Sequence, residues 1–155
     1  MDHERFMGIA LADAEVAGER GDRPIACVIV HGDTIIARGS SLYVTANSAV
    51  HHAENTAVLS CAAYLRSNGP ECVLYTTLEP CVMCLGTILM GNIRNIVFAL
   101  EDKYMRPKEN MTGFTWVQDR IFNYICGVRR DESRRLIETY CDENDRRIIL
   151  DGGRP

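Results

Sequence analysis

The sequence predicts an α/β fold, a three-layer α/β/α sandwich with helices on both faces of a mixed central sheet. The first reason is the order of expected elements over residues 5–99, which is helix–strand–strand–helix–strand–helix–strand. The later strand–helix–strand alternation implies right-handed parallel crossovers, and the opening strand pair adds an antiparallel edge. The second reason is size, because 155 residues with 46% hydrophobic side chains suit a single domain over 1–155.

The first half of the chain supplies a helix and a strand pair. Residues 5–19 carry apolar side chains at helical spacing, which predicts a helix with one buried face. Two β-branched runs follow on either side of Gly32, at 25–30 and 34–37, and predict a hairpin. Residues 39–50 are rich in Ser, Thr and Asn and are expected to form a loop.

The middle of the chain alternates between segments with helical spacing and segments typical of strands. Helical spacing returns over 52–66 and stops at Asn68-Gly69-Pro70. Residues 72–77 are apolar or β-branched throughout, as in a strand covered on both faces. A helix is expected from Pro80, with the proline at its first position, to Gly91, and a strand over 95–99.

The last third carries weaker patterns. Residues 101–116 are interpreted as a loop, 117–126 as helical, 131–141 as a charged helix and 147–150 as a short strand. The C-terminal helices, over 117–142, are expected to complete the pocket or an interface.

Composition narrows the function classes. The net charge of -4 and the pI of about 5.6 argue against a broad polyphosphate-binding surface. No apolar run approaches the ~20 residues that span a bilayer, and the acidic start lacks the basic region of a signal peptide. A cytoplasmic protein is therefore expected. Seven cysteines, an odd number, indicate buried thiols or metal ligands more than disulfides.

Two short stretches carry the chemistry: His52-Ala53-Glu54 and the Pro80–Cys84 segment (PCVMC), each at the start of an expected helix. Cys81 and Cys84 are spaced i, i+3, so one ion can take both thiolates. With His52 they form a set of three ligands that suits Zn²⁺ and leaves a position open for water. Glu54 lies two residues past the histidine, where its carboxylate can move protons as a general acid and base.

These residues resemble the zinc-binding signature of the cytidine and deoxycytidylate deaminase superfamily. The strings at 74–84 (LYTTLEPCVMC) and 93–98 (IRNIVF) resemble its branch of free-base (guanine and cytosine) and transfer-RNA adenosine deaminases. The resemblance covers roughly residues 5–100. It implies a cytidine-deaminase-like fold and hydrolytic deamination of an aminated nitrogen heterocycle. By the same resemblance His52, Cys81 and Cys84 match the zinc ligands, Glu54 matches the proton shuttle, and a homodimer is expected.

Four further residues are candidates for substrate contact: Ser41, Ala53, Glu79 and Trp116. Relatives usually place an asparagine where this chain has Ser41, so the resemblance implies a substrate contact through a short hydroxyl in place of an amide. Glu79 precedes the metal segment and is also expected to support it through hydrogen bonds. Trp116, with Phe114 and Phe122, is expected either to cover a flat ring or to pack in the core.

The expected substrate is a nucleobase or nucleoside such as cytosine, guanine or adenine, or a close analogue, so the partner is a small heterocyclic amine. The C-terminal arginines are interleaved with acids, as on a solvated face, so nucleic acid is not the expected partner. The first alternative is a transfer-RNA adenosine-to-inosine deaminase. The second is a non-catalytic zinc-binding scaffold.

Overall fold

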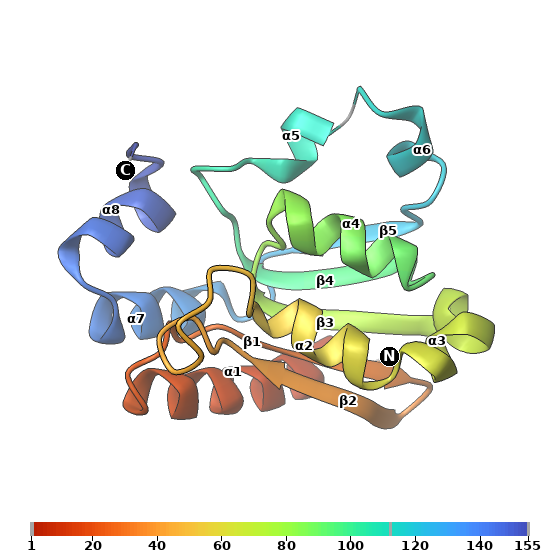
Figure 1. Cartoon of the computed structure of the whole chain (residues 1–155), viewed down its shortest axis with the longest axis horizontal. Coiled ribbons are helices and arrows are strands. Elements are labelled where there is room, and N and C mark those ends of the chain that lie inside the picture. Colours follow the sequence, from red (N-terminus) through yellow and green to blue (C-terminus); the bar gives the residue numbers. More distant parts are fainter. Residues whose placement is uncertain (1, 112, 155) are drawn as a thin grey trace.

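The computed structural model describes residues 2–111 and 113–154. They form a five-stranded sheet with helices on both faces (Figure 1). The strands are β1 (Ala26–His31), β2 (Thr34–Ser40), β3 (Cys72–Leu78), β4 (Asn95–Leu100) and β5 (Asn123–Cys126). The helices are α1 (His3–Glu19), α2 (Ala53–Ser60), α3 (Ala62–Asn68), the 3₁₀ turn η1 (Gly69–Glu71), α4 (Val82–Met90), α5 (Pro107–Met111), α6 (Thr115–Gln118), α7 (Arg130–Tyr140) and α8 (Glu143–Asp151).

The sheet is mixed, in the order β2-β1-β3-β4-β5. β1 pairs antiparallel with β2 and β3, while β3–β4 and β4–β5 are parallel. This confirms the expected α/β class, the antiparallel edge and the parallel crossover. Because β3 and β4 are parallel, their carboxyl ends meet at one edge of the sheet, which is where ligands bind in open α/β sheets.

Both faces of the sheet are covered, which explains the continuous apolar strands. In β1, Cys27 and Ile29 face the core beneath α2 and α4, whereas Val28 and Val30 face α1. All seven residues of β3 are buried. Among the described residues, no helix is long and apolar enough to cross a membrane.

Three expectations about helices need correction. The helix expected over 52–66 is two helices, α2 and α3, because the backbone leaves helical geometry at Cys61 (φ -125°, ψ 19°). Pro80 is not a first helical residue, since α4 begins at Val82 with Cys81 as its N-cap. The stretch 101–116, expected to be a loop, contains the short helix α5 and the start of α6.

For two C-terminal segments the expected kind of secondary structure was wrong. Residues 117–126, expected to be helical, contain the end of α6 and then β5, because the open edge of β4 offers backbone partners that helical spacing does not reveal. The strand expected over 147–150 lies within α8. Asp142 caps that helix by accepting from the Asp145 amide at 2.8 Å, so a local capping signal outweighs the apolar run. The charged helix expected over 131–141 is confirmed as α7.

Gly39 sets the distance between α2 and the sheet. A Cβ at Gly39 would collide with the Ala53 carbonyl oxygen and lie 2.9 Å from the Ala57 amide nitrogen. Both neighbours are backbone, so neither can rotate away. Small residues on both sides therefore let the first turn of α2 lie directly on β2.

Replacing Gly39 by alanine is expected to lower the free energy of unfolding by about 1–3 kcal/mol, the usual cost of overpacking. The variant should also lose zinc affinity, since α2 begins immediately after His52. Urea denaturation and zinc titration measure the two effects. An unchanged denaturation midpoint would contradict the close packing of α2 on β2.

Candidate functional site

Three possible metal ligands converge at the carboxyl-end edge of the sheet. The Nδ1 atom of His52 lies 3.5 Å from the Cys81 sulfur and 3.4 Å from the Cys84 sulfur. His52 is the N-cap of α2 and Cys81 is the N-cap of α4, so two helix N-termini point at one place. Unpaired N–H groups at helix N-termini favour negative charge, which suits thiolates. The fold thus brings together the three ligands predicted from sequence.

The spacing of these atoms fits zinc. Bond lengths of about 2.3 Å to sulfur and about 2.0 Å to nitrogen, in a tetrahedral arrangement, separate nitrogen from sulfur by roughly 3.5 Å. The nitrogen–sulfur distances agree with that value, and all three ligand atoms lie within 4.8 Å of one another. The described residues add no fourth His, Cys, Asp or Glu ligand to this group. A three-ligand set with an open position is the arrangement of catalytic zinc rather than structural zinc.

The two thiols of the site differ in proton affinity. Hydrogen bonding with Cys84, followed by the interaction with His52, lowers the pKa of Cys81 to about 4 despite partial burial. The neighbouring Cys81 sulfur and burial both raise the pKa of Cys84. The pair therefore favours one shared proton between the two sulfurs, and a bound cation favours loss of that proton as well.

Glu54 lies on the first turn of α2, with its carboxylate beside the ligand cluster. The side chain is 3% exposed, and the Thr76 hydroxyl on β3 donates to its Oε1 at 2.9 Å. Burial raises the pKa of Glu54, because it disfavours the charged form. A buried carboxyl held at one oxygen is suited to taking up and releasing a proton.

Glu79 follows the end of β3 and connects it to β4 and β5 beside the cavity. Its Oε1 accepts from the Tyr124 hydroxyl of β5 at 2.9 Å, and its Oε2 accepts from the Asp102 amide at 3.1 Å. Its own amide donates to the Leu100 carbonyl at 2.8 Å. Glu79 therefore ties the segment before Cys81 to the end of β4 and to β5, and it also lines the cavity.

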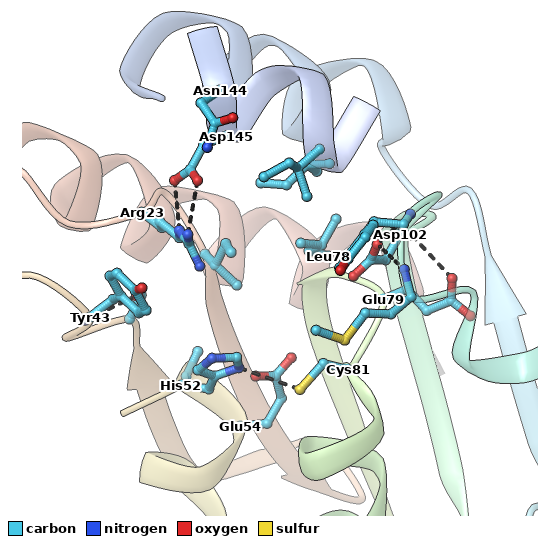
Figure 2. Close-up of a pocket in the computed structure, with 17 residues that line it drawn as sticks. Arg23, Tyr43, His52, Glu54, Leu78, Glu79, Cys81, Asp102, Asn144 and Asp145 are labelled. Carbon is cyan, nitrogen blue, oxygen red and sulfur yellow. Dashed lines mark hydrogen bonds and ion pairs between the residues drawn. The ribbon is translucent and has the colours of Figure 1, made fainter. Parts of the chain in front are cut away.

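A cavity of about 380 Å³ opens above these residues, within the range of small-molecule sites (Figure 2). Among the predicted residues it is lined by Ser41, His52, Ala53, Glu54, Glu79 and Cys81. Ser41 is 3% exposed, and its Oγ accepts from the Tyr43 amide at 3.4 Å. Ala53 is fully buried in the contact with Gly39, so its side chain contributes a small apolar surface.

Trp116 does not line this cavity. It lies on α6, is 42% exposed, and has the Arg120 guanidinium stacked 4.2 Å from its ring centroid. Phe114 and Phe122 are also exposed, so none of the three aromatic side chains is in the core.

The cavity residues that were missed in the sequence include four with polar side chains, namely Arg23, Tyr43, Asp102 and Asp145. Asp102 follows the carboxyl end of β4, a position that could have identified it as a candidate. Its Oδ1 accepts from the Tyr104 and Met105 amides at 2.9 and 3.0 Å. Arg23 and Asp145 lie 122 positions apart, and no local pattern connects them.

Asp22 holds the loop that carries Ser41 and Tyr43. Its Oδ1 accepts from the Val44 and Thr45 amides at 2.8 and 2.9 Å, and its Oδ2 accepts from the Thr45 hydroxyl at 2.6 Å. Arg20 pairs with the same carboxylate at 2.8 Å. Burial opposes the charge, but these hydrogen bonds outweigh it and lower the pKa of Asp22 to about 2.

Asp22→Asn is therefore expected to cost about 2 kcal/mol of stability at pH 7, the equivalent of the difference between pKa 3.8 and about 2. In the wild type this contribution is complete above the unfolded pKa and is lost as the pH falls from about 5 to 2, because the unfolded state binds the proton first. Urea denaturation between pH 2 and pH 7 measures the difference. A cost in the variant that is the same at pH 2.5 as at pH 7 would contradict this account.

Known proteins that resemble this chain include deaminases with a zinc-binding region. Residues 1–100 match the family described as the cytidine and deoxycytidylate deaminase zinc-binding region. The chain is 31% identical over 147 residues to the tRNA-specific adenosine deaminase of Bacillus subtilis (strain 168), covering 90% of this chain and 89% of that one.

Two solved structures extend the likeness. The guanine deaminase from Bacillus subtilis is 34% identical, with a TM-score of 0.60 and coverage of 71% of this chain and 70% of that one. NE0047 in complex with 2,6-diaminopurine is 26% identical, with a TM-score of 0.74 and coverage of 90% and 82%. Matching family, fold and ligand chemistry make Zn²⁺ the cofactor of this site. The chain belongs to the cytidine and deoxycytidylate deaminase family and is a zinc-dependent hydrolase of the C–N bonds of nucleobase-type or nucleoside-type substrates.

Proposed function

We propose that residues 1–155 act as one deaminase domain that releases ammonia from a free nucleobase or nucleoside, or from a close analogue. The observation that carries the proposal is the cavity of about 380 Å³, whose lining includes His52, Glu54 and Cys81. Its other walls are mainly apolar, with Ile25, Leu78, Ile148 and Ile149 among them. Apolar walls with a few placed polar groups are typical of sites for flat small molecules.

His52, Cys81 and Cys84 would hold the zinc ion. When bound, the ion lowers the pKa of water from 15.7 to roughly 7 and so supplies a nucleophile at neutral pH. Glu54 takes the proton that the nucleophile releases and passes it to the ring nitrogen next to the reacting carbon. As the C–O bond forms and the C–N bond breaks, Glu54 transfers the second proton of the water to the amino group. The amino group then leaves as ammonia, and the ring gains a carbonyl. Thr76 holds the Glu54 carboxylate in place through its hydroxyl.

Ammonia release from the zinc-loaded protein against a panel of substrates tests this function. The panel holds cytosine, adenine, guanine, their nucleosides, aminopterins, aminotriazines and an anticodon stem-loop, with Glu54→Gln as the control. Release from one small molecule, lost in the variant, is the expected result. Activity confined to the stem-loop would overturn the choice of a small substrate.

The second candidate function is adenosine-to-inosine deamination of transfer RNA. It is favoured by the 31% identity to a tRNA-specific adenosine deaminase over 90% of this chain. Against it stand the net charge of -4 and the pairing of C-terminal arginines with acids, as in Arg129–Glu132 and Arg134–Glu138. RNA binding that weakens steeply with salt would support this candidate. A non-catalytic scaffold is the remaining alternative, and the buried Glu54 argues against it because a scaffold needs no proton shuttle.

We also propose a homodimer. Large apolar side chains are exposed on two neighbouring helices beside the site, namely Leu59 on α2 and Val82 and Met90 on α4. Exposed apolar groups of this size favour contact with another protein surface. Sedimentation should show a dimer for the wild type and a monomer for a Leu59→Glu/Met90→Glu variant. A wild-type protein that stays monomeric at micromolar concentration would contradict the homodimer.

We propose a cytoplasmic location, because none of the seven cysteines, all of which lie in the described residues, forms a disulfide, as is usual in a reducing compartment. Fractionation of cells that express the tagged chain tests this, and recovery outside the cytoplasm would contradict it.

A further inference from the structure

An ion pair at the rim of the active-site cavity joins the segment that follows α1 to the C-terminal helix α8. The Arg23 guanidinium donates through Nε and Nη2 to the two carboxylate oxygens of Asp145, at 2.7 and 2.9 Å (Figure 2). Tyr43 stacks beneath the same guanidinium, 4.1 Å from its carbon to the ring centroid. Both charged side chains are partly buried, with exposed fractions of 29% and 21%. A bidentate, partly buried pair of this kind fixes orientation as well as proximity.

Asp145 belongs to α8, and α8 forms one wall of the cavity. Its residues Asn144, Asp145, Ile148 and Ile149 line the same space as His52 and Glu54. Figure 2 shows Asn144 and Asp145 on the opposite side of the cavity from His52 and Cys81. A substrate that reaches the ligand cluster must therefore fit beside this helix.

Three contacts hold α8 in this position. Near its start, Asp145 binds Arg23. In its last turn, Ile149 and Leu150 are buried in a cluster with Leu78 and Leu100, the last residues of β3 and β4. Just past its end, Gly152 (φ +71°) packs so closely that a Cβ there would lie 2.8 Å from the Lys103 carbonyl oxygen. The helix thus extends from the Arg23 side of the cavity to the segment that follows Asp102.

We propose that α8 is the specificity-determining wall of this deaminase, and that the Arg23–Asp145 pair positions it so that the cavity admits a free heterocycle and excludes a base carried on folded RNA. The inference rests on the proposed function and adds to it the reason for a small substrate. A base within a stem-loop brings its sugar and phosphates with it, and those groups would have to pass α8. Because Arg23 neutralises the Asp145 carboxylate, α8 excludes those groups by its position and not by charge.

Charge exchange across the pair tests the positioning role. Arg23→Asp places two acids opposite each other, and Asp145→Arg places two guanidinium groups opposite each other. The double variant restores the attraction with the same total side-chain reach. In each single variant, amide hydrogen exchange over residues 143–151 should accelerate about tenfold. The KM for the small substrate should also rise about tenfold, the equivalent of about 1.4 kcal/mol. The double variant should return both values toward those of the wild type, with kcat little changed throughout.

The chain offers a matched control. Arg38 and Asp13 form a second bidentate pair, with distances of 2.7 and 2.6 Å, between β2 and α1 and outside the cavity lining. Arg38→Asp and Asp13→Arg make the same charge changes there, and should alter neither exchange over 143–151 nor KM. An effect equal to that of the Arg23 and Asp145 variants would show that net charge, not the position of α8, is responsible.

The exclusion of RNA is tested with an anticodon stem-loop. Fluorescence anisotropy measures its binding, and ammonia release measures its deamination. The wild type should neither bind nor deaminate it. Unchanged exchange of α8 in both single variants, or wild-type turnover of the stem-loop, would overturn the inference. Failure of the proposed function has a different signature, since ammonia release would then be equal in the wild type and Glu54→Gln while the exchange measurements still report on α8.

Discussion

Replacing Glu54 by glutamine is expected to lower kcat by about 10²–10⁴-fold, the usual contribution of a general acid–base residue. The amide has the shape of the carboxyl group and can still accept from the Thr76 hydroxyl, but it cannot carry a proton between water and the ring. His52, Cys81 and Cys84 are unaltered, so zinc content should remain that of the wild type. Ammonia release and metal analysis on the same preparation measure the two quantities.

Glu15→Gln is the control for this experiment. Glu15 is an exposed residue of α1, on the far side of the sheet from the cavity, and its replacement makes the same chemical change without touching the site. It should leave kcat within about twofold of the wild type. Retention of wild-type kcat by Glu54→Gln would remove Glu54 from the proton-transfer role and revive the scaffold alternative.

Replacing Cys84 by serine is expected to weaken zinc binding by more than about 100-fold, since even residues that only orient a metal ligand contribute 10–100-fold. The Cys84 side chain is fully buried, so water does not readily take over the lost ligand. Zinc should raise the Tm of the wild type, because a ligand that binds only the folded state stabilises it. The same addition should leave the Tm of Cys84→Ser nearly unchanged.

Cys72→Ser is the matched control for the loss of a buried thiol. Cys72 is buried at the start of β3, and its sulfur donates to the Asn68 carbonyl at 3.3 Å, a hydrogen bond that a serine hydroxyl can replace. The zinc affinity of Cys72→Ser, measured by competition with a chelator, should equal that of the wild type. If Cys84→Ser bound one zinc per chain with wild-type affinity, the three-ligand site would be wrong.

Ser41 occupies an instructive place in the cavity. Its backbone is fixed on both sides, since its amide donates to the Ile25 carbonyl at 2.8 Å and its carbonyl accepts from Arg20 at 2.9 Å. These two backbone hydrogen bonds therefore fix the position of the short Ser41 side chain. Its contact with substrate stays a prediction, which the KM of a Ser41→Ala variant across the substrate panel would test.

Local residue patterns are enough to predict the chemistry of the site and the core of the fold. Cys81 and Cys84 lie three positions apart at the start of α4, so this local pattern already specifies two metal ligands on one side of a helical turn. His52-Ala53-Glu54 likewise places a third ligand and a carboxylate two positions apart. The buried strands β1, β3 and β4 were recognisable because a strand covered on both faces must be apolar throughout. In each case the physical cause acts within a few residues and is therefore visible in the chain itself.

The outer wall of the cavity and the C-terminal elements depend on contacts between segments that are distant in the chain. β5 exists because β4 has an open edge, and its exposed residues carry no burial pattern of their own. Arg23 and Asp145 become neighbours only when α8 is packed by Ile149 and Leu150 against the ends of β3 and β4. Helical and strand periodicities report contacts within one element, whereas the size of the substrate that can enter depends on contacts between residues more than a hundred positions apart.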